Sequence, residues 1–183
     1  QILDATEKLV AEVGVEATTT RAIAERAGVA VPSLYRFFSG RDEILDALLA
    51  QLVADLDDQA RRAEAEWHPG DVRGLLRLEL DLHAAYFETH PSLSALWFGG
   101  RASAAVIDAV RRRNHALALR VRDLLVSHDL IDHDSPVQPF DLLTELGDRI
   151  LEVACCDPGK PDREVLTLGL VALTALIEHG PAR

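Results

Sequence analysis

Apolar residues recur at the three- and four-residue spacing of an α-helix along nearly the whole chain, and this pattern limits the possible folds most. A clear example is the stripe formed by Ile44, Leu45, Leu48, Leu49, Leu52 and Leu56. No segment shows the alternation of β-branched and polar residues that is typical of a half-buried strand. We therefore expect an all-α fold with about nine helices.

Glycine, proline and short polar clusters divide the chain into these helices. The expected helices cover residues 2–14, 21–27, 31–38, 41–66, 71–90, 91–98, 102–128, 138–155 and 162–179. Ser39 and Asp42 predict a capping box that opens the helix at Arg41. The last helix is apolar on most of its faces, so other helices must cover it on more than one side.

Residues 18–41, TTTRAIAERAGVAVPSLYRFFSGR, contain two short helical segments joined by a glycine. Gly28 can adopt the left-handed conformation that ends a helix, and Pro32 is tolerated in the first turn of the next one. Two helices joined by so short a turn form a helix-turn-helix. The side chains expected to pack between them are Ile23, Ala24, Ala27, Leu34 and Phe38.

Positive charge is concentrated in this same segment. Between residues 17 and 41, four arginines stand against one glutamate, a balance of +3, whereas the whole chain carries -11 at pH 7. Attraction to the phosphates of a nucleic acid is therefore expected here, and it is disfavoured elsewhere on the chain.

Three short motifs in this region resemble the signature of the tetracycline-repressor (TetR) family. They are TTTR at residues 18–21, AERAGV at 24–29 and LYRFF at 34–38, and residues 2–14 and 41–45 resemble the family's flanking helices. The resemblance implies a DNA-binding domain at residues 1–50, with its helix-turn-helix at about 18–38. It also implies an effector-binding and dimerisation domain at residues 51–183.

Hydroxyl groups and positive charge suit DNA phosphates, whereas side chains that face outward from the second helix suit base edges. We assign Thr19, Thr20, Tyr35 and Arg41 to phosphates. Arg21 and Arg36 could reach DNA or could pair with a carboxylate such as Glu25. The predicted DNA-binding residues are Thr19, Thr20, Arg21, Val31, Pro32, Ser33, Tyr35, Arg36, Phe37 and Arg41.

The recognition surface departs from the family pattern at three positions. Where the family commonly has Ser, Lys and His, this chain has Ala30, Val31 and Phe37. Base readout is therefore expected to depend on Ser33, Pro32 and apolar contacts with thymine methyl groups.

The resemblance also implies that the last two helices form a four-helix interface with a second copy of the chain. The predicted interface residues are Leu143, Leu146, Ile150, Val153, Leu168, Val171 and Leu176. The alternative is a last helix that is buried within a monomer. A dimer would allow two recognition helices to read a palindromic operator.

The middle of the chain mixes aromatic side chains with a few polar ones, as small-molecule sites do. The predicted effector-pocket residues are His83, Tyr86, Phe87, Trp97, Phe98, Arg101, Asn114, His115, Asp148 and Glu152. Each of them could instead be an ordinary core or surface residue.

Other kinds of site find little support in the sequence. There is no nucleophile elbow, phosphate loop or metal-ligand spacing, and adjacent Cys155 and Cys156 cannot staple the fold, so we expect no cofactor and no metal. The longest uncharged apolar run, residues 165–177, is too short to span a bilayer, and the cytoplasm is the expected compartment. The chain starts inside a helix without a methionine, so we expect a basic N-terminal arm to be missing.

These features predict a ligand-responsive, sequence-specific transcriptional regulator, a repressor that a small molecule releases from a palindromic operator. One alternative is a helical adaptor or small-molecule-binding protein without DNA activity. A second alternative is an enzyme that uses His83 and His115 as acid and base.

Overall fold

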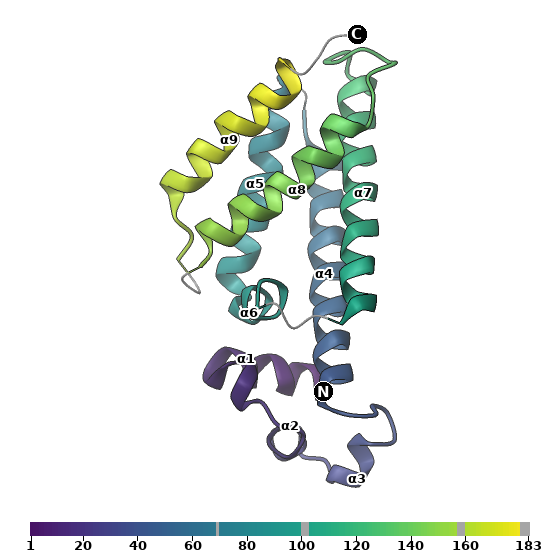
Figure 1. Ribbon diagram of the computed structural model, residues 1–183, viewed down its shortest axis with the longest axis vertical. Coiled ribbons are helices and arrows are strands. Elements are labelled where there is room, and N and C mark those ends of the chain that lie inside the picture. Colours follow the sequence, from purple (N-terminus) through teal and green to yellow (C-terminus); the bar gives the residue numbers. More distant parts are fainter. Residues whose placement is uncertain (69, 100–102, 157–159, 180–183) are drawn as a thin grey trace.

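The computed structural model describes residues 1–68, 70–99, 103–156 and 160–179, and these residues form nine helices and no strand (Figure 1). The helices are α1 (Ile2–Ala17), α2 (Thr20–Ala27), α3 (Val31–Leu34), α4 (Arg41–Glu66), α5 (Val72–Thr89), α6 (Pro91–Trp97), α7 (Ala104–Ser127), α8 (Gln138–Ala154) and α9 (Arg163–Glu178). The prediction of an all-α fold is confirmed.

Several helices begin at a side-chain cap, which gives an unpaired N–H of the first turn its acceptor. Thr19 accepts a hydrogen bond from the Ala22 N–H at the start of α2. The N-caps of α5, α7 and α9 act in the same way, and they are Asp71, Ser103 and Asp162.

The end of α2 agrees with the sequence prediction, whereas the start of α4 does not. Gly28 ends α2 with a φ of 66°, the left-handed conformation that the sequence predicted. The capping box predicted between Ser39 and Asp42 is wrong, because the N-cap of α4 is Gly40 and the Ser39 N–H donates to the Glu43 carboxylate. Glu43 lies one residue further along the helix, where its side chain reaches back over the first turn.

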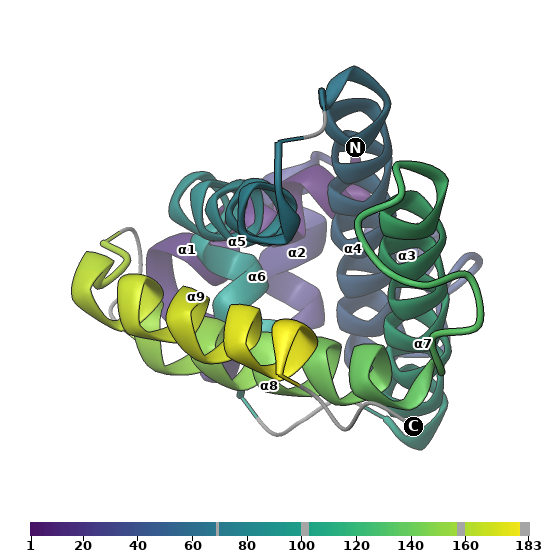
Figure 2. The ribbon, with the colours of Figure 1, turned by 90° about the horizontal axis from the view of Figure 1, so that it is seen from above.

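The helices are arranged in two parts that share α4. In Figure 1, α1, α2 and α3 lie at the lower end, while α5, α7, α8 and α9 form a bundle with the upper length of α4. Viewed from above, α4 and α7 lie side by side, and α5, α8 and α9 complete the upper bundle (Figure 2). The short helix α6 lies between the two parts and contacts α1.

Two clusters of buried side chains correspond to these parts. The smaller is formed by Leu9, Ile23, Ala24, Leu34 and Ile44, and the larger joins α4 through α9 together with Val10 of α1. They meet within α4, where Ile44 belongs to the smaller cluster and Leu45 to the larger one. The domain boundary near residue 50 remains a prediction, and it falls inside this unbroken helix.

Candidate functional site

The helix-turn-helix is held together by the side chains that the sequence placed between its helices. Ile23, Ala24 and Leu34 are fully buried, and Phe38 packs against them from a turn that follows α3, which ends at Leu34 and is shorter than the expected helix 31–38. Small residues on α2 allow the two helices to cross closely. The predicted inward packing is confirmed.

The opposite side of α3 is open to solvent. Pro32, Tyr35, Arg36 and Phe37 are exposed, and Phe37 is 68% accessible. Val31 and Ser33 are half-buried at the start of the helix. An exposed phenylalanine beside an arginine and a tyrosine gives this surface the apolar and cationic groups that contact DNA bases and phosphates.

The four arginines of this region have different environments. Arg26 forms a two-pronged ion pair with Glu12, at 2.9 and 2.5 Å. Arg41 donates from Nε to the Thr18 carbonyl at 2.6 Å and from Nη2 to the Val15 carbonyl. Arg41 therefore ties α4 to the end of α1, a structural task that the phosphate assignment did not anticipate.

The side chains of Arg21 and Arg36 form no hydrogen bond or ion pair within the part of the chain that the structure describes. Both are exposed, and neither pairs with Glu25. Of the four arginines, these two are thus the ones whose guanidinium groups are free to meet an external anion.

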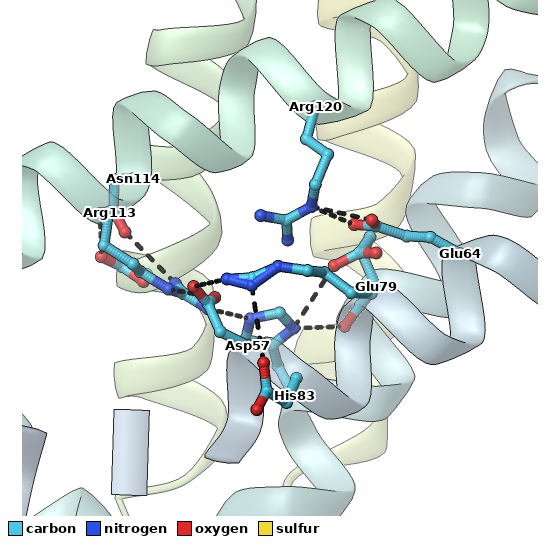
Figure 3. Close-up of polar contacts among 10 residues, drawn as sticks. Asp57, Glu64, Glu79, His83, Arg113, Asn114 and Arg120 are labelled. Carbon is cyan, nitrogen blue, oxygen red and sulfur yellow. Dashed lines mark hydrogen bonds and ion pairs between the residues drawn. The ribbon is translucent and has the colours of Figure 1, made fainter. Parts of the chain in front are cut away.

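A second polar site is buried between α4, α5 and α7 (Figure 3). Arg113 of α7 donates from Nε to Asp57 Oδ1 at 2.8 Å and from Nη2 to His83 Nε2 at 2.9 Å. Nδ1 of His83 lies 2.7 Å from the Glu79 carbonyl oxygen. Because guanidinium only donates, His83 accepts at Nε2 and carries its proton on Nδ1.

The neutral form of His83 also follows from its burial. Loss of hydration, and then the positive charge of Arg113, lower the pKa of His83 to about 4. At neutral pH this histidine is an uncharged link between α5 and α7.

Two further carboxyl groups lie beside these residues. Arg120 of α7 binds Glu64 of α4 through Nε, at 3.0 and 2.8 Å from its two carboxylate oxygens. Glu79 is 8% exposed, and neither of its carboxyl oxygens has a hydrogen-bond partner among the described residues. Burial, and then the proximity of Glu64, raise the pKa of Glu79 to about 8.

Asp148 of α8 is the other carboxyl group with an altered affinity for protons. Burial raises the pKa of Asp148 to about 6, although its hydrogen bond from Asn114 opposes this shift. The Asn114 amide nitrogen donates to Asp148 Oδ2 at 2.6 Å. This bond joins α7 to α8.

Two cavities adjoin these polar groups. The inner cavity, between α5, α7, α8 and α9, has a volume of about 50 Å³, and mostly leucine and valine side chains line it together with Glu79, His83, Arg113, Thr144 and Asp148. The outer cavity, of about 190 Å³, is lined by Leu49, Trp97, Val106, Ile107, Val110, Arg111, Asn114, Glu145 and Asp148. Asp148 lines both, and the inner one has room for a few water molecules.

The predicted effector-pocket residues are thus only partly brought together. His83 and Asp148 line the inner cavity, and Trp97, Asn114 and Asp148 line the outer one. Phe98 and Glu152 line a shallower hollow beside them, and Phe87 is buried against Phe98 with ring centroids 5.3 Å apart. Arg101 lies outside the described residues.

Two other predicted pocket residues point elsewhere. The Tyr86 hydroxyl donates to Asp55 on α4 at 2.9 Å, and its ring stacks on His90. His115 is 55% exposed and lies 2.7 Å from Asp141, so it lines neither cavity. The enzyme alternative requires His83 and His115 to face one common point. The structure places them apart.

Glu79 and Arg113 were missed by the sequence reading. Glu79 interrupts a leucine-rich stretch, and a lone acid at an inward helical position is a signal that could have been used. Arg113 is the last of three consecutive arginines, and their order alone does not show which one faces inward.

Comparison with known proteins agrees with the helix-turn-helix. Residues 2–48 match the family model for bacterial regulatory proteins of the tetR family. The HTH-type transcriptional repressor KstR of Rhodococcus jostii is 33% identical over 117 residues, which cover 60% of this chain and 52% of KstR. Residues 2–48 are thus similar to the N-terminal segment of tetR-family regulators.

Solved structures extend the likeness over the whole chain. A TetR-family transcriptional regulator from Streptomyces coelicolor is 28% identical with a TM-score of 0.73, covering 97% of this chain and 96% of that one. The fatty acid degradation regulator FadR from Bacillus halodurans shares the fold, with a TM-score of 0.75 at 19% identity over 100% of this chain and 95% of its own. The chain spans about half the length of KstR and a smaller share of the tetracycline repressor of class A from Escherichia coli, 31%.

The chain exposes an apolar face on its last two helices. Leu146, Val153, Leu168 and Val171 are between 39% and 64% exposed. Leu143 is a correction to the predicted interface, because it is 6% exposed and lines the inner cavity. Ile150 and Leu176 are half-buried.

The two helices that form this face, α8 and α9, pack closely against each other. A Cβ atom added at Gly169 would lie 2.5 Å from Cγ2 of Ile150, closer than real side chains approach. The absence of a side chain at residue 169 therefore sets the separation of the two helices.

Neither a metal site nor a membrane span is found in the described residues. They contain no group of three or more histidine, cysteine or acidic side chains placed to hold a metal ion. None of their helices combines the length and hydrophobicity that crossing a bilayer requires. Cys155 is buried, Cys156 is exposed, and both are free thiols.

Proposed function

We propose that this protein is a homodimeric transcriptional repressor of the tetR family that binds a palindromic operator in the cytoplasm. A small molecule in the cavities among α4, α5, α7, α8 and α9 releases it. The exposed helix-turn-helix surface with two unpaired arginines carries this proposal. Residues 1–50 serve as the DNA-binding domain and residues 51–183 as the effector-binding and dimerisation domain.

The exposed groups suit separate tasks on DNA. Arg21, Arg36 and the hydroxyls of Thr20 and Tyr35 bind phosphates, which position the protein. Pro32, Ser33 and Phe37 face base edges, where an aromatic ring can contact thymine methyl groups. Arg41 contributes by fixing α4 against α1.

The link between effector and DNA runs through α4. Ile44 of this helix belongs to the core of the helix-turn-helix, whereas Asp57 and Glu64 bind arginines of α7 beside the cavities. An effector that fits only one position of α7 shifts the population toward that position and moves α4 with it. The fold accommodates ligands in relatives, since FadR from Bacillus subtilis was solved in complex with stearoyl-CoA.

The dimer rests on the exposed apolar face of α8 and α9. Solvent-exposed leucine and valine at adjacent positions are stabilised when a second copy covers them. Two-fold symmetry then places two recognition helices on successive turns of the duplex.

Selection of genomic fragments tests the proposal directly. Fragments retained by the purified protein are sequenced, and the recovered duplex is titrated by fluorescence anisotropy at rising salt concentrations. We expect a palindromic motif, and an affinity that falls steeply with salt because bound phosphates release counterions. No enriched motif, or an affinity that is independent of salt, would contradict DNA recognition.

A further inference from the structure

The buried polar site contains more acidic groups than basic ones. Asp57, Glu64, Glu79 and Asp148 supply four carboxyl groups, and Arg113 and Arg120 supply two guanidinium groups. Each arginine is already paired, Arg113 with Asp57 and Arg120 with Glu64, at 2.8 Å in both cases. Among the described residues, Glu79 and Asp148 have no hydrogen bond to a cation, and both line the inner cavity together with Arg113.

Glu79 is the less satisfied of these two carboxyl groups. Asp148 accepts a hydrogen bond from Asn114, whereas neither oxygen of Glu79 accepts from an N–H or hydroxyl donor in the described residues, and its polar neighbour is another carboxyl group, that of Glu64. Oε2 of Glu79 lies 3.8 Å from His83 Nδ1, whose proton is directed instead to the Glu79 carbonyl oxygen. A buried carboxyl group without a partner loses its hydration and gains nothing in return.

The neighbouring residues cannot supply the missing cation. His83 accepts from Arg113 at Nε2, so a second proton there would oppose the guanidinium group. Nη2 of Arg120 is also buried without a partner, but that arginine already binds Glu64 and does not line the inner cavity. On the outer side, Arg111 shares the cavity wall with Glu145.

We propose that the effector is a small organic cation, an apolar body with one protonated amine, whose nitrogen binds Glu79 with Asp148 as the second carboxylate. This inference rests on the proposed function, since it names the class of molecule that the cavities take. Leu76, Leu117, Val121 and Leu173 surround the inner cavity and exclude water from the pair. A charge-assisted bond to an ammonium group is strong in such an environment.

The apolar body extends toward the outer cavity. The inner cavity, with about 50 Å³, suits an amino group, and the outer one, with about 190 Å³, suits a short hydrocarbon chain or ring. Asp148 lines both, so a movement of this one side chain connects them. Trp97 lines the outer cavity and is placed to report binding through its fluorescence.

A matched set of three probes tests the chemical class. The full chain carrying Trp67→Phe, which leaves Trp97 as its single tryptophan, is titrated separately with hexylammonium, 1-hexanol and hexanoate. We expect a saturable change in fluorescence with hexylammonium, weaker binding of the alcohol, and the weakest binding of the carboxylate. Equal or tighter binding of either comparison compound, or no saturable binding of hexylammonium, would overturn the proposal.

Two substitutions test whether the ammonium group of the probe binds Glu79. Glu79→Gln keeps the shape of the side chain and is expected to weaken hexylammonium binding about tenfold to a hundredfold, as for loss of a charged hydrogen bond. Glu88→Gln makes the same change on the exposed end of α5, where Glu88 meets Arg163, and is expected to leave binding unchanged. Thermal melts confirm that both variants fold, and an unchanged affinity in Glu79→Gln would reject the assignment.

The two proposals can fail separately. Probe binding is measured without DNA, and the salt dependence of operator binding is measured without probe. Operator binding without amine binding rejects only the effector class, whereas amine binding without operator binding rejects only the repressor.

Discussion

Nε of Arg113 lies 2.8 Å from Oδ1 of Asp57, and this ion pair joins α7 to α4 with 8% and 14% of the two side chains exposed. Arg113 also binds His83 and lies 5.6 Å from the centroid of the Trp97 ring. One guanidinium group thereby contacts the helix that leads to the helix-turn-helix and residues that line both cavities.

Loss of this pair should destabilise the protein strongly. Asp57→Asn leaves a buried guanidinium without its counter-charge, and we expect the free energy of unfolding to fall by about 3 kcal/mol. Urea denaturation measures the change. Asp58→Asn is the control, because Asp58 is 62% exposed and lies 3.6 Å from Arg61, a surface pair worth about 0–1 kcal/mol. If the two substitutions lower the free energy of unfolding equally, the buried pair contributes no more to stability than the surface pair.

The two free arginines should determine the salt dependence of operator binding. Arg36→Ala and Arg21→Ala should each weaken binding and reduce the slope of log affinity against log salt by about 1.8, because each dimer loses two phosphate contacts. Arg26→Ala should change the slope less, since Arg26 is neutralised by Glu12. Anisotropy titrations of one duplex compare the three variants, and a larger slope change for Arg26→Ala would refute this division.

Arg41 should matter even when no DNA is present. Arg41→Ala removes the donors to the Thr18 and Val15 carbonyls, and we expect a loss of about 1–3 kcal/mol in unfolding free energy. A residue that only contacted phosphate would leave stability unchanged. Chemical denaturation of the DNA-free protein distinguishes these outcomes.

The pH dependence of stability should reveal Glu79. The pKa of Glu79 is about 8 in the folded protein against an ordinary value of 4.5, so unfolding between these values releases a proton. Stability contributed by the protonated group is therefore present at low pH and is lost as the pH rises through this range. Glu79→Gln removes that loss.

The Glu79→Gln variant should therefore gain stability relative to the unsubstituted protein as the pH rises, by up to about 5 kcal/mol at the upper end of the range. Asp148, with a pKa of about 6, contributes in the same direction at lower pH, whereas His83, with a pKa of about 4, contributes in the opposite direction. Both groups remain in the variant, so the difference between the two proteins isolates Glu79. Denaturation at several pH values measures it, and a difference that is constant with pH would exclude the raised pKa.

The exposed face of α8 and α9 should hold the dimer. Leu168→Glu combined with Val171→Glu places two charges on that face, and we expect monomers with much reduced operator affinity. Arg163→Glu, at the exposed start of α9 and away from these two residues, makes a charge change of the same kind as a control. Sedimentation gives the mass, and an unchanged dimer in the double variant would reject the assignment.

The periodicity of apolar residues was sufficient to predict the helices, and the turn chemistry of Gly28 was sufficient to locate the helix-turn-helix. The direction of individual polar side chains was not predictable in this way. Asn114 and His115 are neighbours about 100° apart around α7, and only Asn114 turns inward, where it is 3% exposed. That choice depends on how the helix is rotated against α4 and α8, which pattern alone leaves open.

The same limit applies to the arginines. Charge predicted that residues 17–41 attract phosphates, but it could not separate Arg41, which binds backbone carbonyls, from Arg36, which is free. Long side chains reach partners that are distant in the sequence, and those partners are defined only when the fold is assembled.

The unbroken length of α4 acts as a lever. Its 26 residues make a rigid rod about 39 Å long, with the helix-turn-helix at one end and the Asp57 and Glu64 anchors along the other half. A tilt of about 5° about the anchored end displaces the opposite end by about 3 Å, which is close to the rise of one base pair. A small tilt of α4 beside the cavities is thus converted into a misfit of about one step along the double helix.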